Sequence, residues 1–63
     1  MEDQKKLKIN NLPDYAGLYD YVVYRSVNGE AWFLGAYNSV AEAQKAAEEV
    51  HGYIEEVRNI DTV

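Results

Sequence analysis

The fold of this chain is decided by residues 18–37, which read LYDYVVYRSVNGEAWFLGAY. The first half is rich in β-branched and aromatic side chains, which favour strands. Asn28-Gly29 follows at once, and this dipeptide favours a tight type I′ turn because both central residues of that turn need a positive φ. The second half again carries aromatic and aliphatic side chains. We therefore predict a β-hairpin with strands at 18–27 and 30–37.

Two further features shape the sheet around this hairpin. Residues 6–10 alternate polar and apolar side chains, which is the period of a half-buried strand, and we predict an edge strand there. Pro13 and its polar neighbours predict a turn after this strand, because proline fixes φ and lacks a donor. Gly35, inside the second arm, indicates a β-bulge or a place where a neighbouring group approaches the backbone closely.

A helix is predicted to follow the hairpin, over residues 40–51. Ser39 and Glu42 have the spacing of a capping box, in which the serine hydroxyl accepts from the backbone N–H of Glu42 and the Glu42 carboxylate reaches back. The apolar stripe of this helix is narrow and consists of Val40, Ala43, Ala47 and Val50. Small side chains of this kind let a helix lie close to a sheet that carries large rings.

The end of the helix leaves two alternatives. His51-Gly52 indicates a stop, with a cation near the last carbonyls and glycine just past the cap, so that residues 53–60 would form a further strand. Ile54 and Val57, however, extend the apolar stripe in register, as if one helix continued through them. We favour the stop at Gly52.

These elements together predict the α+β class. The expected architecture is a small three-stranded antiparallel sheet, centred on the hairpin, with one helix packed on one face; a stop at Gly52 adds a strand at 53–60. The 63 residues suffice for a single domain. Residues 1–5 and the last few residues are expected to fray.

The composition excludes several classes of protein. Hydrophobic residues make up 48% of the chain, too many for a disordered tail, and the absence of cysteine excludes disulfides and thiolate chemistry. A single histidine and no cysteine argue against a zinc site, and we expect no metal and no cofactor. The polar N-terminus argues against a secretory signal peptide, and no stretch approaches the roughly 18 apolar residues of a membrane span. We expect a cytoplasmic protein without membrane contacts.

Residues that could carry catalysis are scattered. His51 is the only imidazole, Ser26 lies at a strand end, and Ser39 is expected to cap the helix rather than act as a nucleophile. The carboxylate pairs at 48–49 and 55–56 are adjacent in sequence, so neither pair would face one cleft from a helix or a strand. We therefore predict that the chain is not an enzyme.

Two surfaces are candidates for binding a partner. Six basic and eleven acidic residues give a net charge of 6 − 11 = −5, which opposes non-specific binding to nucleic acid and favours a protein partner with a basic surface. The acidic candidate is the polar side of the helix, with Glu42, Glu48 and Glu49. The aromatic candidate is a face of the sheet, because tyrosine and tryptophan are favoured interface anchors. It comprises Tyr19, Tyr21 and Trp32.

A local resemblance concerns residues 34–46, from the end of the second arm into the helix. This stretch resembles the strand-to-helix junction of AP2-type plant DNA-binding domains and of the related N-terminal domains of phage and transposon integrases. The matching residues are Leu34, Gly35, Tyr37, Ser39, Glu42, Ala43 and Ala46. The resemblance implies a three-stranded antiparallel sheet with one helix behind it. In that family arginine and tryptophan side chains of the sheet read DNA, and Arg25 and Trp32 would take those places here.

The primary functional hypothesis is a small acidic interaction protein that binds a protein partner and modulates or inhibits it. One form of this hypothesis is a phage or mobile-element product that blocks a host nucleic-acid-binding machine, with carboxylates occupying a basic groove meant for phosphates. The alternative is a sheet-type DNA-binding domain of the AP2 and integrase kind. From the resemblance we take only the expected architecture, and not the DNA-binding function.

Overall fold

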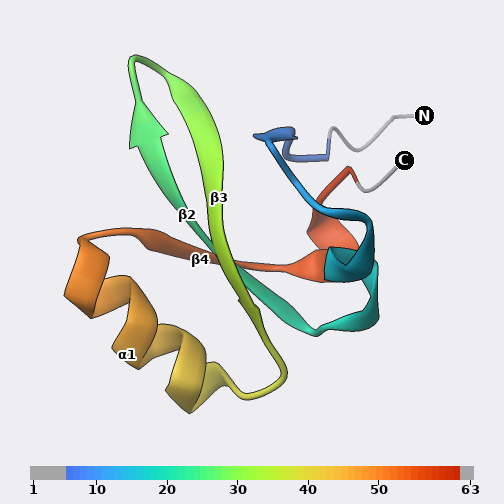
Figure 1. Cartoon of the computed structure of the whole chain (residues 1–63), viewed down its shortest axis with the longest axis vertical. Coiled ribbons are helices and arrows are strands. Elements are labelled where there is room, and N and C mark those ends of the chain that lie inside the picture. The colour runs from blue at the N-terminus through green and yellow to red at the C-terminus, as the bar shows by residue number, and fades with distance from the viewer. Residues whose placement is uncertain (1–5, 62–63) are drawn as a thin grey trace.

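The computed structural model describes residues 6–61, and its strands form one four-stranded sheet in the order β1-β3-β2-β4 (Figure 1). In chain order the elements are β1 (Ile9–Asn10), the 3₁₀ helix η1 (Asp14–Leu18), β2 (Tyr21–Val27), β3 (Glu30–Tyr37), α1 (Val40–Val50), β4 (Tyr53–Glu56) and the 3₁₀ helix η2 (Val57–Asn59). The predicted α+β class is confirmed. The sheet is mixed rather than purely antiparallel, because β1 runs parallel to β3. The fraying expected of both chain ends falls outside the described residues.

The β2–β3 hairpin closes through the predicted two-residue turn. Asn28 and Gly29 have φ angles of 53° and 83°, as a type I′ turn requires, and Val27 pairs with Glu30 directly before it. The first arm is shorter than expected, because β2 begins at Tyr21. The preceding η1 helix holds the backbone of Tyr19, whose N–H donates to the carbonyl of Ala16.

A β-bulge interrupts the second arm at the position that Gly35 indicated. Val23 pairs with Gly35 and Tyr24 pairs with Phe33, so Leu34 is an additional residue of β3. The close approach is also present, because a Cβ on Gly35 would lie 2.8 Å from the hydroxyl of Tyr37. The bulge changes the alternation of side chains along β3.

One core lies between the sheet and α1. Val23, Ala43 and Ala47 are buried there, and a ring of partly buried side chains packs around them: Tyr21, Tyr37, Ala46 and Ile54. The centre of the predicted helical stripe is therefore confirmed. Its two ends are not in this core, because Val40 and Val50 are exposed. The helix meets the sheet through its middle, where alanines allow close contact.

The second core lies on the other face of the sheet, and the two ends of the chain cover it. Its buried members are Ile9, Ala16, Val22, Ala31 and Ile60. Leu7 holds the ends together: its N–H donates to the carbonyl of Asn59 at 2.9 Å, and its carbonyl accepts from the N–H of Asp61 at 2.8 Å. The predicted strand at 6–10 is thus reduced to β1 and a bridge between Leu7 and Ile60.

The chain after α1 resolves the two alternatives for its C-terminal part. The helix ends at Val50 and β4 follows, so the predicted stop is confirmed and a continuous helix is wrong. Ile54 faces the core under α1 and Val57 faces the opposite core, which one helical stripe could not do. The further strand covers four residues of the expected 53–60, since η2 follows it.

The residue in the left-handed conformation at this helix end is His51, with φ 55° and ψ 42°, and not Gly52 as its position had indicated. Gly52 has a different role. A Cβ on Gly52 would lie 2.7 Å from the backbone oxygen of Tyr24, so only glycine fits between the helix end and β2. Its N–H donates to the carbonyl of Ala47 at 2.8 Å and closes the last turn.

The turn of the hairpin is tested by Gly29→Val. We expect a loss of about 1–3 kcal/mol in the free energy of unfolding, because a β-branched residue is strained at positive φ. Denaturant unfolding measures the loss. Gly17→Val is the matched control, since Gly17 has no left-handed φ and no neighbour within 4 Å. Equal effects of the two substitutions would contradict a strained turn.

The helix end is tested by a pair of substitutions with opposite signs. Gly52→Ala is expected to destabilise by about 1–3 kcal/mol, because its methyl group would press on the backbone of β2. His51→Gly is expected to stabilise by about 1 kcal/mol, because glycine adopts the left-handed conformation without the cost to an L-residue. Thermal unfolding midpoints give both signs. A stabilising Gly52→Ala would mean that the chain does not pass close to Tyr24.

Candidate protein-binding surface

The helix leaves the turn end of the hairpin uncovered. The 11 residues of α1 span about 16 Å, whereas the eight residues of β3 span about 26 Å. Figure 1 shows the hairpin turn projecting away from α1, while β1 pairs with β3 near that turn. Side chains near the turn on the helix-side face of the sheet are therefore covered by no other element of residues 6–61.

The register of the hairpin gathers an apolar group on this uncovered face. Val23 faces α1, so alternation along β2 places Arg25 and Val27 on the same face, and Trp32 is paired directly with Arg25. Leu34 continues this face along β3 up to the bulge. We call these four residues the hairpin patch: Arg25, Val27, Trp32 and Leu34. Its three apolar side chains are 42–44% exposed.

The predicted acidic surface is present on α1 but is not uniformly acidic. Glu42, Glu48 and Glu49 are all exposed. At 3.6 residues per turn, Lys45 lies directly opposite the buried Ala43 and Ala47 edge of the helix, and therefore at the centre of the outward surface. The three carboxylates surround one ammonium group, which weakens their combined field.

The three predicted aromatic residues do not share one surface. The Tyr19 ring packs edge-to-face on Tyr15, with centroids 6.1 Å apart, and it precedes β2 rather than belonging to it. Tyr21 is half-buried against α1. Trp32 alone of the three belongs to the hairpin patch. The separation follows from the late start of β2 and from the position of the helix.

Sequence reasoning missed Val27 and Leu34 as members of an exposed surface. Two signals were available for finding them. The Asn28-Gly29 turn fixes the cross-strand partners, and the short predicted helix cannot reach the end of a hairpin whose second arm is eight residues long. Tyr53 was also missed, and it belongs to a different feature.

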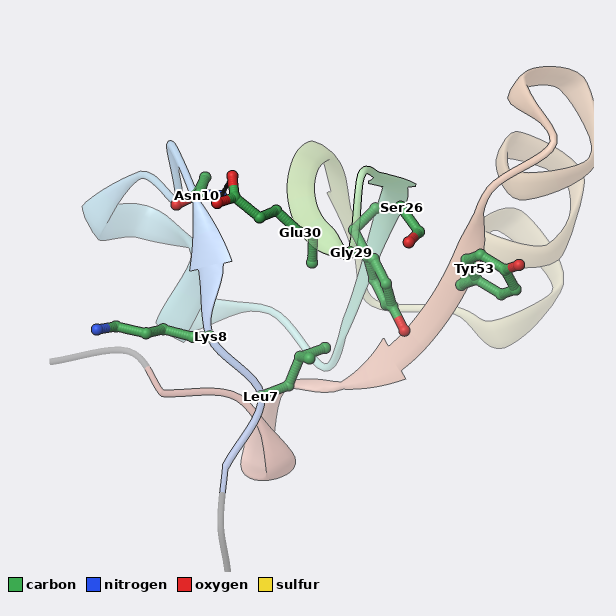
Figure 2. A pocket seen from close by; sticks show the side chains of 9 residues that line it. Leu7, Lys8, Asn10, Ser26, Gly29, Glu30 and Tyr53 are labelled. Atoms are coloured by element: carbon green, nitrogen blue, oxygen red, sulfur yellow. Dashed lines mark hydrogen bonds between the residues drawn. The ribbon is translucent and has the colours of Figure 1, made fainter.

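That feature is a shallow cleft on the opposite face of the sheet, near the same turn. Its volume is about 510 Å³, and β1, the hairpin and the first residue of β4 line it (Figure 2). The rings of Tyr24 and Tyr53 lie together in it, with centroids 5.6 Å apart and an interplanar angle of 33°. Asn10 donates to the Glu30 carboxylate at 3.2 Å at the β1 side. We call this feature the tyrosine cleft.

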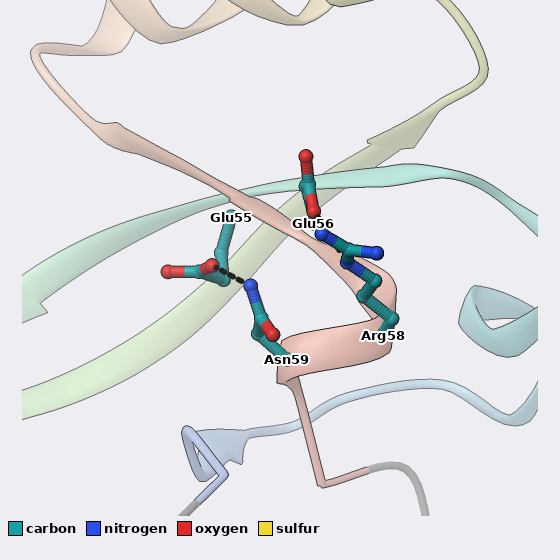
Figure 3. A network of polar contacts seen from close by, with 4 residues as sticks. All are labelled: Glu55, Glu56, Arg58 and Asn59. Atoms are coloured by element: carbon teal, nitrogen blue, oxygen red, sulfur yellow. Dashed lines mark hydrogen bonds and ion pairs between the residues drawn. The ribbon is translucent and has the colours of Figure 1, made fainter.

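Burial raises the pKa of the Tyr24 phenol, and the nearby charge of Glu55 raises it further. The phenol therefore remains protonated throughout the neutral range. Figure 3 shows how Glu55 is held: its Oε2 accepts from the Asn59 amide at 3.0 Å. The adjacent Glu56 instead forms an exposed ion pair with Arg58, with 2.8 Å between Nε and Oε1. Glu55 thus keeps a charge that its partner does not cancel.

Residues 6–61 hold neither a metal-binding cluster nor a membrane-spanning helix. Within that range, no three or more histidine, cysteine, aspartate or glutamate side chains are grouped so that they could hold a metal ion. No helix within it has both the length and the apolar character needed to cross a membrane.

Comparison with known proteins gives no relative from which a function could be transferred. No family model matches the chain, and no curated protein or solved structure is significantly similar to it. The assignment of a function therefore depends on the residues of this chain alone.

Proposed function

We propose that this chain is a small, non-enzymatic binding module that attaches to a protein partner through the hairpin patch. The observation that carries the proposal is the exposed Trp32, which lies with Val27 near the turn of the hairpin, while Leu34 is exposed farther along β3, at the bulge. Tryptophan is among the residues that contribute most to binding energy when a partner buries it. Arg25, on the same face, supplies a polar contact beside the apolar centre.

The net charge of −5 supports a partner with a basic surface. The carboxylates of α1 lie outside the hairpin patch, so they would act mainly on the rate of association, by steering a basic partner toward the chain. Inhibition of a host nucleic-acid-binding machine by a phage or mobile-element product is the finer form of this proposal. In it, the carboxylates would occupy the partner's phosphate-binding groove.

Binding of DNA by the sheet is the alternative proposal, and one observation favours it. Arg25 and Trp32 are cross-strand partners and both are exposed. In the domains that residues 34–46 resemble, however, the sheet face turned away from the helix reads DNA. Here both residues lie on the helix-side face, and residues 7–18 and 57–60 cover much of the other. This arrangement supports the protein partner over DNA.

The proposal is tested by capture from cells in which the chain occurs naturally, with quantification by mass spectrometry. Trp32→Ser is expected to lose the captured partner while the chain stays folded, at a cost of about 1–2 kcal/mol in the free energy of unfolding, because the ring is 42% exposed and only partly packed. Leu18→Ser is the matched control, because Leu18 is 82% exposed and lies in η1, away from the hairpin turn. Equal capture by both variants would contradict a role for the hairpin patch.

The contribution of the acidic helix is tested separately by reversing Glu42 and Glu49 to lysine. We expect slower association and a smaller dependence of binding on salt, with capture retained, because exposed charges act at long range and are screened by ions. Surface plasmon resonance at two salt concentrations measures both. Complete loss of binding would instead make α1 the contact surface. A duplex DNA shift by the wild type, lost in Arg25→Ala, would favour the alternative proposal.

A further inference from the structure

The tyrosine cleft is not used by the function proposed above. It lies on the face of the sheet opposite to the hairpin patch, and its walls come from segments far apart in the chain. Leu7 stands on one side and Tyr53 on the other, with the hairpin strands between them (Figure 2). A volume of about 510 Å³ is within the range of small-ligand sites and is large enough for one long side chain.

The aromatic lining suits a positively charged group. Tyr53 is 57% exposed and Tyr24 is partly buried beside it, so the ring pair presents both an accessible edge and a desolvated interior. A cation within about 6 Å of a tyrosine ring is attracted by the negative face of the ring, and more strongly where water is partly excluded. The ring pair therefore selects for charge as well as for shape.

The carboxylates around the cleft act in the same direction. Glu55 follows Tyr53 by two residues on the same face of β4, and Glu30 lies toward β1. Asn10 donates to the Glu30 carboxylate and Asn59 donates to the Glu55 carboxylate. Both donors are neutral amides, so they do not cancel the negative charges. Burial raises the pKa of Tyr24, and the nearby Glu55 raises it further, which is consistent with the position of Glu55 on the same face as this ring.

Among residues 6–61, Lys8 is the one cationic residue that lines the cleft, and its side chain does not occupy it. Figure 2 shows the Lys8 side chain extending away from Tyr53 and Ser26. The cleft thus combines two rings and nearby carboxylates, and no cationic side chain from residues 6–61 lies between them.

We propose that the tyrosine cleft binds the guanidinium group of an arginine contributed by a basic protein partner. A guanidinium is planar, stacks on aromatic rings and is less strongly hydrated than an ammonium, which favours arginine over lysine. The source of the arginine rests on the proposed function. Binding of an isolated guanidinium does not, so the two proposals can fail separately.

The first experiment titrates N-acetyl-arginine amide into the full chain and follows tyrosine ring and backbone resonances by NMR. N-acetyl-citrulline amide, a neutral compound of the same shape, is the control. We expect saturable shifts at Tyr24, Tyr53 and Leu7, with citrulline binding about tenfold more weakly. Equal binding of the two compounds, non-saturating shifts, or shifts centred on the carboxylates of α1 would overturn the proposal.

Matched variants then locate the site. Tyr53→Leu is expected to weaken binding of the arginine compound about tenfold. Tyr15→Leu should leave it unchanged, because Tyr15 is similarly exposed, at 53%, but lies outside the cleft. Glu55→Gln should weaken it several-fold, and Glu48→Gln, on the helix, should not. Equal effects within either pair would overturn the assignment. These titrations contain no partner protein, so their result does not depend on whether Trp32 takes part in capturing one.

Discussion

Two adjacent residues in β2, Val22 and Val23, set the requirement that the rest of the structure meets. Both are completely buried, and because successive side chains of a strand point to opposite faces, the sheet must be covered on both sides. The helix covers Val23 with alanines. On the other face, Val22 is covered by the first and last segments of the described residues, which contribute Ile9 and Ile60. A domain of this size has too few residues for a further layer. Side chains of the sheet that neither α1 nor these segments cover are therefore exposed.

The uncovered region is the turn end of the hairpin, and its two faces differ in chemistry. The bulge at Leu34 matters here, because the additional residue places Trp32 and Tyr37 on the same face although they lie an odd number of positions apart. Tyr37 packs under the helix and Trp32 emerges beyond it. On the other face the hairpin supplies part of the tyrosine cleft, together with β1 and β4. One projecting end thus carries an apolar patch on one side and an aromatic, acidic cleft on the other.

This arrangement gives the two proposals a common physical form. A partner that encloses the end of the hairpin would bury Trp32 on one side and place a basic side chain against Tyr24 and Tyr53 on the other. The apolar contact would supply most of the affinity, and the charged contact would contribute selectivity, because neutral side chains gain little from the ring faces and carboxylates. The exposed carboxylates of α1 remain available to guide the approach.

Local features followed from the sequence because they depend on residues only a few positions apart. The Asn28-Gly29 turn needs only a positive φ at two neighbouring residues, and the Ser39 hydroxyl accepts from the Glu42 N–H within one helical turn. Tertiary structure decided the rest. The need for glycine at position 52 depends on Tyr24, whose backbone oxygen approaches it from β2. Likewise, Trp32 is exposed and Tyr21 covered because burial depends on where the helix comes to lie. Those outcomes are set by contacts between distant segments, which local preferences cannot specify.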